Sequence, residues 1–353
     1  MKETIHFSDL EPKLLPTFFA KTIPEINVMF SHTGILASRN HFSVKHGLDQ
    51  IDYVIAYKPK TLFVWQFSAM CTHYPDTFTS KKFYHESCKD NLKTFFKHLP
   101  NSKIIYCCNN EESLNVVPTE YGDRVSGILC NHNATLDRNI FSIGGKNPKL
   151  RLWDSVYVAR IATQKRHYLA KHLNKIALVT AGITDSLGFD EVYKEVCSNL
   201  STKHFLFLHS DNIHSNEVLG ILNDSKVGLC LSEKEGAMFS SIEYLLCGLP
   251  IVSTKSKGGR DVFFTDKNCI IAEDTPESVS ECVQHWLDNY PTRKQRNKIR
   301  EEAIATQKKH TKVLKDKLKE ISPSDIDIDE IYKKEYIHKM HHGTTLHYKG
   351  KFT

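Results

Sequence analysis

The sequence lacks long apolar segments, and it lacks the cysteine pairs that hold metals or disulfides. No hydrophobic run approaches the ~20 residues needed to span a bilayer. The first ten residues, MKETIHFSDL, contain no apolar secretion-signal core. The ten cysteines include no Cys-x-x-Cys pair, and most lie in apolar runs typical of buried thiols, among them Cys230, Cys247 and Cys269. These absences exclude a disulfide framework and a cysteine-ligated zinc site, and they favour a cytoplasmic protein.

Outside one segment, the sequence also carries almost no net charge. The formal net charge is +6, but residues 291–320 alone hold eleven Lys/Arg against four Asp/Glu, so the rest of the chain is close to neutral. The basic segment lacks interleaved aromatic residues, so no nucleic-acid partner is expected. We predict one or two helices here that pack back on the N-terminal domain. The alternative is peripheral contact with an anionic membrane surface.

A carboxylate metal site is missing as well. No Asp-x-Asp pair follows a predicted strand, and the acidic run Asp325–Asp329 lies in the C-terminal tail. The histidines of residues 338–347 show no spacing typical of a metal site. We therefore predict no essential metal and no cofactor.

What the sequence does contain is an alternation of strand and helix patterns. Strands are predicted at Ile26–Phe30, Ile51–Ala56, Thr61–Phe67, Lys103–Cys108, Val125–Cys130, Ser155–Ile161, Ile176–Ala181, His204–His209, Val227–Leu231, Pro250–Thr254 and Cys269–Ala272. Helices are predicted at Asn40–Leu48, Lys89–Leu99, Gln164–Leu173, Asp190–Leu200, Asn216–Asp224, Met238–Cys247 and Pro276–Asn289. This alternation predicts an α/β protein with parallel sheets covered on both faces.

A chain of 353 residues is long for one domain. The turn-rich stretch Gly144–Pro148 is the predicted linker. We predict an N-terminal Rossmann-like domain at 1–147, a second Rossmann-like domain at 148–290, and basic helices with a tail at 291–353.

The most informative stretch is Glu235–Gly259, which reads EGAMFSSIEYLLCGLPIVSTKSKGG. Two glutamates, Glu235 and Glu243, lie eight positions apart across a loop and a helix start. Small residues at a helix start let backbone N–H groups approach an anion. A carboxylate at each end of this turn can bind hydroxyls, which a phosphate cradle alone does not need. The combination favours a ligand with both phosphate and polyol groups, such as a nucleotide-sugar.

This stretch resembles the donor site of the GT-B-fold retaining glycosyltransferases of the "group 1" family, whose Glu-x7-Glu motif is followed by Gly-x-Pro and a buried strand. Glu235, Glu243, Gly248 and Pro250 match that motif, whereas Met238 stands where many members have glycine. The resemblance implies two Rossmann-like domains with parallel sheets facing each other across a cleft. It also implies transfer of a sugar from a UDP- or GDP-linked donor with retention of configuration, to a glycan, lipid or small-molecule acceptor.

The resemblance also implies roles for individual residues. Arg160 and Lys165 correspond to the family's Arg…Lys pair, which stabilises the leaving diphosphate. Glu243 corresponds to the ribose-binding glutamate and Glu235 to the group that binds a sugar hydroxyl. Further donor contacts are predicted at Gly34, His209, Gly236, Ala237, Met238, Phe239 and Ser240. For the histidine of the N-terminal domain that points into the cleft, His73 is the candidate and His32 the rival.

Two other functions stay open at this point. The first is a catalytically inactive module that binds a nucleotide-sugar, which the lone Gly34 in the first glycine loop favours. The second is an epimerase or phosphorylase on the same fold. An epimerase consumes donor without an acceptor, so product analysis separates it from a transferase.

Overall fold

The computed structural model describes residues 27–32, 61–66, 103–115, 117, 119–180, 205–209, 213–321 and 329. The chain forms two compact units, one of Met1–Leu136 with Gln307–Thr353 and one of Asp137–Thr306. The division into sequence domains at 147/148 and 290/291 stays a prediction.

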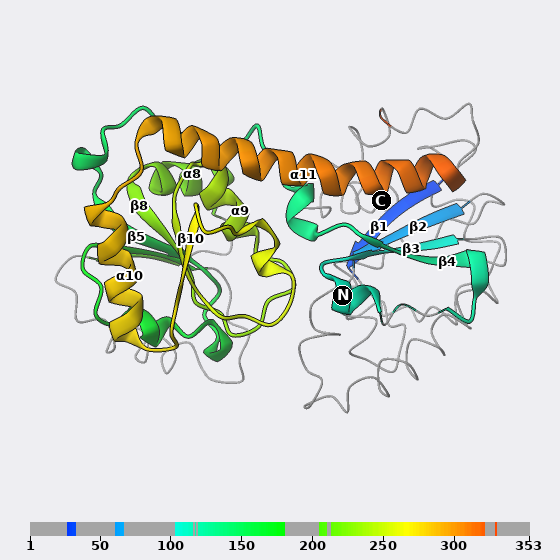
Figure 1. The fold of residues 1–353 in the computed structure, drawn as a ribbon, viewed down its shortest axis with the longest axis horizontal. Coiled ribbons are helices and arrows are strands. Elements are labelled where there is room, and N and C mark those ends of the chain that lie inside the picture. Colours follow the sequence, from blue (N-terminus) through cyan, green and yellow to red (C-terminus); the bar gives the residue numbers. More distant parts are fainter. Residues whose placement is uncertain are drawn as a thin grey trace, which may run out of the picture. The chain divides into compact units, whose positions relative to one another are not determined.

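The first unit contains a parallel sheet in the order β1-β2-β3-β4 (Figure 1). Its strands are β1 (Asn27–His32), β2 (Thr61–Gln66), β3 (Lys103–Cys108) and β4 (Val125–Leu129), with the short helix α6 (Glu111–Leu114) between the last two. The C-terminal part of helix α11 (Arg293–Ile321) also belongs to this unit. There the Gln307 amide donates to the carbonyls of Asn133 and Leu136, both at 3.1 Å.

The second unit contains a parallel sheet in the order β10-β9-β8-β5-β6-β7. Its strands are β5 (Trp153–Val158), β6 (Ile176–Thr180), β7 (Phe205–His209), β8 (Ser225–Cys230), β9 (Ile251–Thr254) and β10 (Cys269–Ala272). Side chains such as Val156 in β5 and Leu229 in β8 are fully buried. The parallel α/β organisation that the sequence predicts is therefore confirmed.

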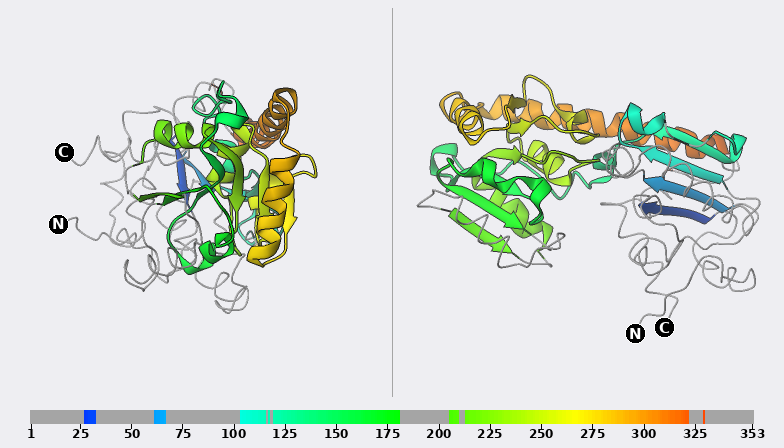
Figure 2. Two further views of the ribbon diagram at one scale, coloured as in Figure 1. Left: turned by 90° about the vertical axis from the view of Figure 1, so that its left-hand side faces the viewer. Right: turned by 90° about the horizontal axis from the view of Figure 1, so that it is seen from below.

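Helices cover both faces of this second sheet (Figures 1 and 2). Helices α8 (Ser215–Asn223) and α9 (Phe239–Leu246) pack on one face, and α10 (Pro276–Asp288) packs on the other. The predicted start of α10 is confirmed, because the Thr275 hydroxyl accepts the N–H of Ser278 at 3.2 Å and Pro276 occupies the first turn. No helix in the described part of the chain is long and apolar enough to cross a membrane.

Helix α9 ends in a Schellman motif, which explains the Gly-x-Pro sequence. Gly248 has a φ of +65°, its N–H donates to the carbonyl of Leu245 at 2.9 Å, and Leu249 donates to Tyr244 at 2.9 Å. Glycine is required there because a Cβ would lie 2.9 Å from the carbonyl oxygen of Arg296. Pro250 then precedes β9.

Two arginines of α11 bind the carbonyl groups at this end of α9. Arg296 donates to the carbonyls of Cys247 and Gly248, both at 2.9 Å. Arg300 donates to the carbonyl of Leu246 at 2.5 Å. Cations are favourable at a helix C-terminus, where the macrodipole is negative. Residues 293–306 of α11 are therefore part of the structure that holds α9.

One predicted helix, Gln164–Leu173, is wrong. The segment forms two short 3₁₀ helices instead, η5 (Thr163–Lys165) and η6 (His167–Ala170). Arg166 separates them in the left-handed conformation, with φ 49° and ψ 47°. Its side chain is bonded to the ends of two strands, and this tertiary contact outweighs the helical preference of the local sequence.

Candidate functional site

Three of the predicted site residues follow the carboxyl ends of two neighbouring strands, β5 and β8. Arg160 lies two residues beyond β5 and is exposed to solvent. Lys165 follows in η5, and Glu235 lies in the loop after β8. The Lys165 ammonium forms an ion pair with Oε1 of Glu235, and each side chain is only 13% exposed. The structure thus joins two groups that are 70 residues apart in sequence.

The turn that carries Lys165 is held from below by a buried tyrosine. The Tyr157 hydroxyl donates to the Lys165 carbonyl at 2.6 Å and lies 3.4 Å from the Ser232 hydroxyl. Burial raises the pKa of Tyr157, so the phenol stays protonated and able to donate. The His167 ring packs against the Tyr157 ring, with 5.0 Å between their centroids. The backbone of Lys165 is therefore held in place by a buried tyrosine that is itself packed against His167.

The loop that carries Glu235 pairs with the loop after β9. The N–H of Lys257 donates to the carbonyl of Glu233, and the N–H of Glu235 donates to the carbonyl of Lys257, both at 3.0 Å. The N–H of Glu233 also donates to the carbonyl of Gln164 at 3.2 Å, which ties this loop to the turn of Lys165. Backbone pairing on both sides fixes the position of Glu235.

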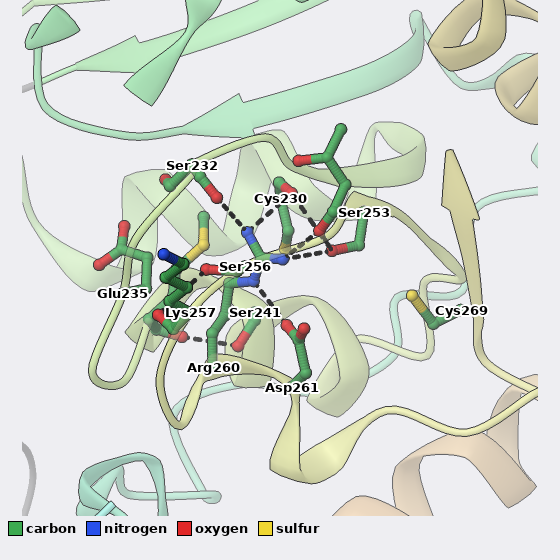
Figure 3. A network of polar contacts seen from close by, with 12 residues as sticks. Cys230, Ser232, Glu235, Ser241, Ser253, Ser256, Lys257, Arg260, Asp261 and Cys269 are labelled. Carbon is green, nitrogen blue, oxygen red and sulfur yellow. Dashed lines mark hydrogen bonds and ion pairs between the residues drawn. The ribbon is translucent and has the colours of Figure 1, made fainter. Parts of the chain in front are cut away.

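Beneath these loops lies a fully buried arginine, Arg260, which sequence reasoning missed (Figure 3). Its guanidinium donates to the carbonyls of Cys230 and Ser232 at 3.0 and 2.8 Å, to the Ser253 hydroxyl at 2.8 Å and to Asp261 at 2.7 Å. Burial has the largest single influence and acts to lower the pKa of Arg260. The charges of Asp261, Cys230 and Glu235 and the hydrogen bond to Asp261 together outweigh it, so the pKa is raised. Arg260 is therefore a permanently charged group beneath the rim, by which we mean the loops of Lys165 and Glu235 at the carboxyl ends of β5 and β8.

Arg166 is a second buried arginine at the same strand ends, and sequence reasoning missed it as well. It donates to the carbonyl of Leu231 at 2.8 Å and to the Thr254 hydroxyl at 2.6 Å, and it forms an ion pair with Asp274 at 2.9 Å. For each arginine, the one signal in the sequence is which residues it follows. Arg166 directly follows Lys165, and Arg260 directly follows the Gly258-Gly259 turn.

The start of α9 meets the end of β5 through two hydrogen bonds to a single residue. The Ser240 hydroxyl donates to the carbonyl of Val158 at 2.9 Å, and the N–H of Val158 donates to the Tyr244 hydroxyl at 2.7 Å. Met238 is buried and is the residue before the helix, with no side-chain cap. The remaining predicted donor contacts in this segment are buried Gly236 and half-buried Ala237 and Phe239. The helix N-terminus is therefore placed beside the rim that carries Lys165.

Glu243 lies in the middle of α9 and is 3% exposed. Its charge raises the pKa of Cys247 in addition to burial, which is the larger cause and brings that pKa to about 12. The predicted role of Glu243 in binding ribose hydroxyls stays a prediction.

Several other predicted residues fall elsewhere. His209 is the last residue of β7, at the carboxyl end of the same sheet. Gly34 and His73 lie outside the described residues, and their roles stay predictions. In the described part of the chain, no group of three His, Cys, Asp or Glu side chains could hold a metal ion. Independence of metal also stays a prediction.

We expect acid to destabilise the protein through His167. Burial, with a smaller contribution from Lys165, lowers the pKa of His167 from 6.5 to about 4. As pH falls, the unfolded chain takes up this proton first, so stability is lost below pH 6.5 and the loss is complete near pH 4. The expected loss in the free energy of unfolding is about 2 kcal/mol at pH 5. Urea unfolding at pH 7 and pH 5 measures it.

The control for this measurement is His167→Phe, which keeps an aromatic ring against Tyr157 but cannot titrate. Its loss of stability between pH 7 and pH 5 should be smaller than that of the wild type by about 2 kcal/mol. Equal losses in the two proteins would show that other groups carry the acid sensitivity.

Comparisons with known proteins agree with this architecture. Residues 146–306 match the family "Glycosyl transferases group 1". No curated protein sequence matches the chain. The fold is similar to that of the pneumococcal O-GlcNAc transferase GtfA, solved in complex with UDP and GlcNAc, with 11% identity, coverage of 84% of this chain and 57% of that chain, and a TM-score of 0.52.

Two further solved structures are similar, with lower TM-scores. A glycosyltransferase from Rickettsia africae has 17% identity, coverage of 74% of this chain and 71% of that chain, and a TM-score of 0.47. The C-terminal domain of the group 1 family protein LpcC from Francisella tularensis has 16% identity, coverage of 49% and 97%, and a TM-score of 0.37. The family match therefore covers residues 146–306, and the chain has the GT-B fold of a glycosyltransferase.

Proposed function

We propose that this glycosyltransferase transfers a sugar from a nucleotide-sugar donor to a glycan, lipid or small-molecule acceptor, with retention of anomeric configuration. The observation that carries the proposal is the Lys165–Glu235 ion pair at the carboxyl ends of β5 and β8. In this proposal Lys165 is the cation that meets the leaving diphosphate, and Glu235 is the adjacent carboxylate that binds sugar hydroxyls. In parallel α/β sheets, ligands bind outside these strand ends.

The chemistry follows from the charges that develop during the reaction. Breaking the bond between sugar and phosphate builds negative charge on the departing oxygen. Lys165, together with the exposed Arg160, offsets that charge. The N-terminal end of α9 adds a positive dipole end at the same rim. Glu243 accepts hydrogen bonds from the ribose hydroxyls, and Glu235 accepts one from the sugar.

A panel of UDP- and GDP-sugars tests the proposal. Binding is measured by thermal shift, because a ligand that binds only the folded state raises the melting temperature. Release of nucleoside diphosphate and the fate of the sugar are then followed for each donor that binds. Donor that binds without being consumed would identify an inactive binding module. Donor converted to an isomeric nucleotide-sugar would identify an epimerase.

We expect Glu243→Gln to weaken the binding of free nucleoside diphosphate. The substitution removes the charged acceptor for ribose hydroxyls and keeps the shape of the side chain. A loss of about 1–3 kcal/mol in binding free energy is expected, measured by calorimetric titration. The matched control is the exposed Glu281→Gln in α10, which should bind like the wild type. Unchanged affinity in the folded Glu243 variant would remove this residue from the site.

We expect turnover to survive an excess of chelator. The reason is that Arg160 and Lys165 supply the positive charge that a divalent ion supplies at other diphosphate sites. Release of nucleoside diphosphate is compared with and without EDTA, and again after magnesium or manganese is added back. Activity that disappears with EDTA and returns with either ion would contradict the proposed role of the two cations.

A further inference from the structure

Arginine side chains bind backbone carbonyls at the ends of strands β8 and β9. The carbonyls of Cys230, Leu231 and Ser232 accept hydrogen bonds from an arginine at 3.0, 2.8 and 2.8 Å. The Thr254 carbonyl accepts a further arginine N–H at 2.5 Å. The donors are Arg166 and Arg260, which no sequence motif or expected catalytic role includes.

Arg260 has no donor left for a substrate. Its five N–H groups are taken by the carbonyls of Cys230, Ser232 and Thr254, the Ser253 hydroxyl and the Asp261 carboxylate (Figure 3). The Ser232 carbonyl that it binds begins the loop of Glu235, three residues on. Arg260 therefore fixes the point from which this loop leaves the sheet.

Arg166 does the same for the other partner of the ion pair. It directly follows Lys165, and its left-handed backbone, unusual for a residue other than glycine, ends the turn that carries Lys165. Its side chain anchors that turn to the Leu231 carbonyl and to the Thr254 hydroxyl. The third guanidinium nitrogen contacts the half-exposed Asp274.

We propose that Arg166 and Arg260 are positioning residues of the glycosyl-transfer site, with Arg166 setting the place of Lys165 and Arg260 setting the place of Glu235. The proposal rests on the proposed function. Both members of the ion pair are thereby fixed to the same strand ends. Lysine cannot replace either arginine, because its three donors diverge from one nitrogen and cannot bind several carbonyls as the planar fork does.

The two arginines predict different defects, because the diphosphate contacts Lys165 and the sugar contacts Glu235. In Arg166→Lys, we expect the Kd of free UDP or GDP, whichever the wild type binds more tightly, to rise about 5- to 10-fold, together with a fall in kcat. In Arg260→Lys, we expect that Kd to stay within about twofold, while kcat/KM for the matching nucleotide-sugar falls about 10- to 100-fold. Turnover is measured as release of nucleoside diphosphate with water as acceptor.

Milder variants provide the test if a lysine variant fails to fold. Asp261→Ala and Asp274→Ala each remove one partly exposed carboxylate from one arginine and leave the strand ends bonded. Asp261→Ala should reproduce the sugar-specific defect of Arg260→Lys, and Asp274→Ala the diphosphate defect of Arg166→Lys, each to a smaller extent. Melting temperatures are recorded for all variants.

The outcomes separate this assignment from the proposed function. Different defects in the two arginines support the assignment. Two results overturn it and make both arginines merely structural. One is an equal change in the Kd for nucleoside diphosphate and in kcat/KM in both variants. The other is a lower melting temperature with a wild-type Kd and a wild-type kcat/KM. A wild-type protein that binds neither nucleoside diphosphate overturns the proposed function, and the assignment falls with it.

Discussion

Lys165→Ala should lower kcat by about 100- to 1000-fold, the range measured when one preorganised donor to a developing negative charge is removed. The Lys165 ammonium is held by its ion pair with the Glu235 carboxylate, and the Lys165 backbone is held by the hydrogen bond from the Tyr157 hydroxyl to the Lys165 carbonyl. A charge that is already in place needs no reorganisation during the reaction, so most of its effect falls on the transition state. The measurement is release of nucleoside diphosphate from the donor that the panel identifies.

Two controls isolate the charge of Lys165. Lys149→Ala removes an exposed lysine from the same unit and should behave like the wild type. The double variant Lys165→Ala/Glu235→Gln tests whether the defect comes from a carboxylate left unpaired. We expect no recovery of kcat in the double variant. A Lys165→Ala enzyme with kcat within about threefold of the wild type would show that the leaving group is stabilised elsewhere.

Gly228→Ala should lower the free energy of unfolding by about 3 kcal/mol, at the upper end of the usual range for an overpacked core. A Cβ at this position of β8 would lie 2.3 Å from Cδ2 and 2.5 Å from Cγ of the Tyr244 ring. Tyr244 is fully buried and cannot move without releasing the N–H of Val158. Urea unfolding followed by circular dichroism measures the loss.

The matched control is Gly220→Ala in α8. Nothing lies within 4 Å of a Cβ at Gly220, which is exposed and inside a helix. Alanine there should raise the free energy of unfolding by about 0.5–1 kcal/mol, because glycine loses more backbone entropy on folding. The same substitution at the two glycines should therefore change the free energy of unfolding in opposite directions. A stable Gly228→Ala protein would mean that Tyr244 has another place to pack.

The ends of the strands of the second unit could be predicted from sequence to within three residues. Runs such as Cys269–Ala272 and Ile251–Thr254 are short, apolar and rich in β-branched residues, and a buried parallel strand requires that composition. The C-terminal end of α9 was equally readable, because only glycine suits the left-handed position at Gly248.

The segment 164–173 could not be read in this way. Its composition permits a helix, but the side chain of Arg166 binds groups at Leu231 and Thr254, far away in sequence. The two arginines under the rim were missed for a related reason. A lone arginine in a loop has the same local pattern whether it is exposed or fully buried, and only the tertiary structure places Arg260 among the strand ends.

The arginine bonds to the end of α9 have a consequence for how this domain can be inherited. Arg296 and Arg300 lie about fifty residues after the carbonyls of Cys247 and Leu246 that they bind. The family match and the compact unit both end at residue 306, so both include these arginines. A gene rearrangement that carried only the strands and helices up to α10 would leave the end of α9 without its donors. The smallest exchangeable module therefore includes the first half of α11.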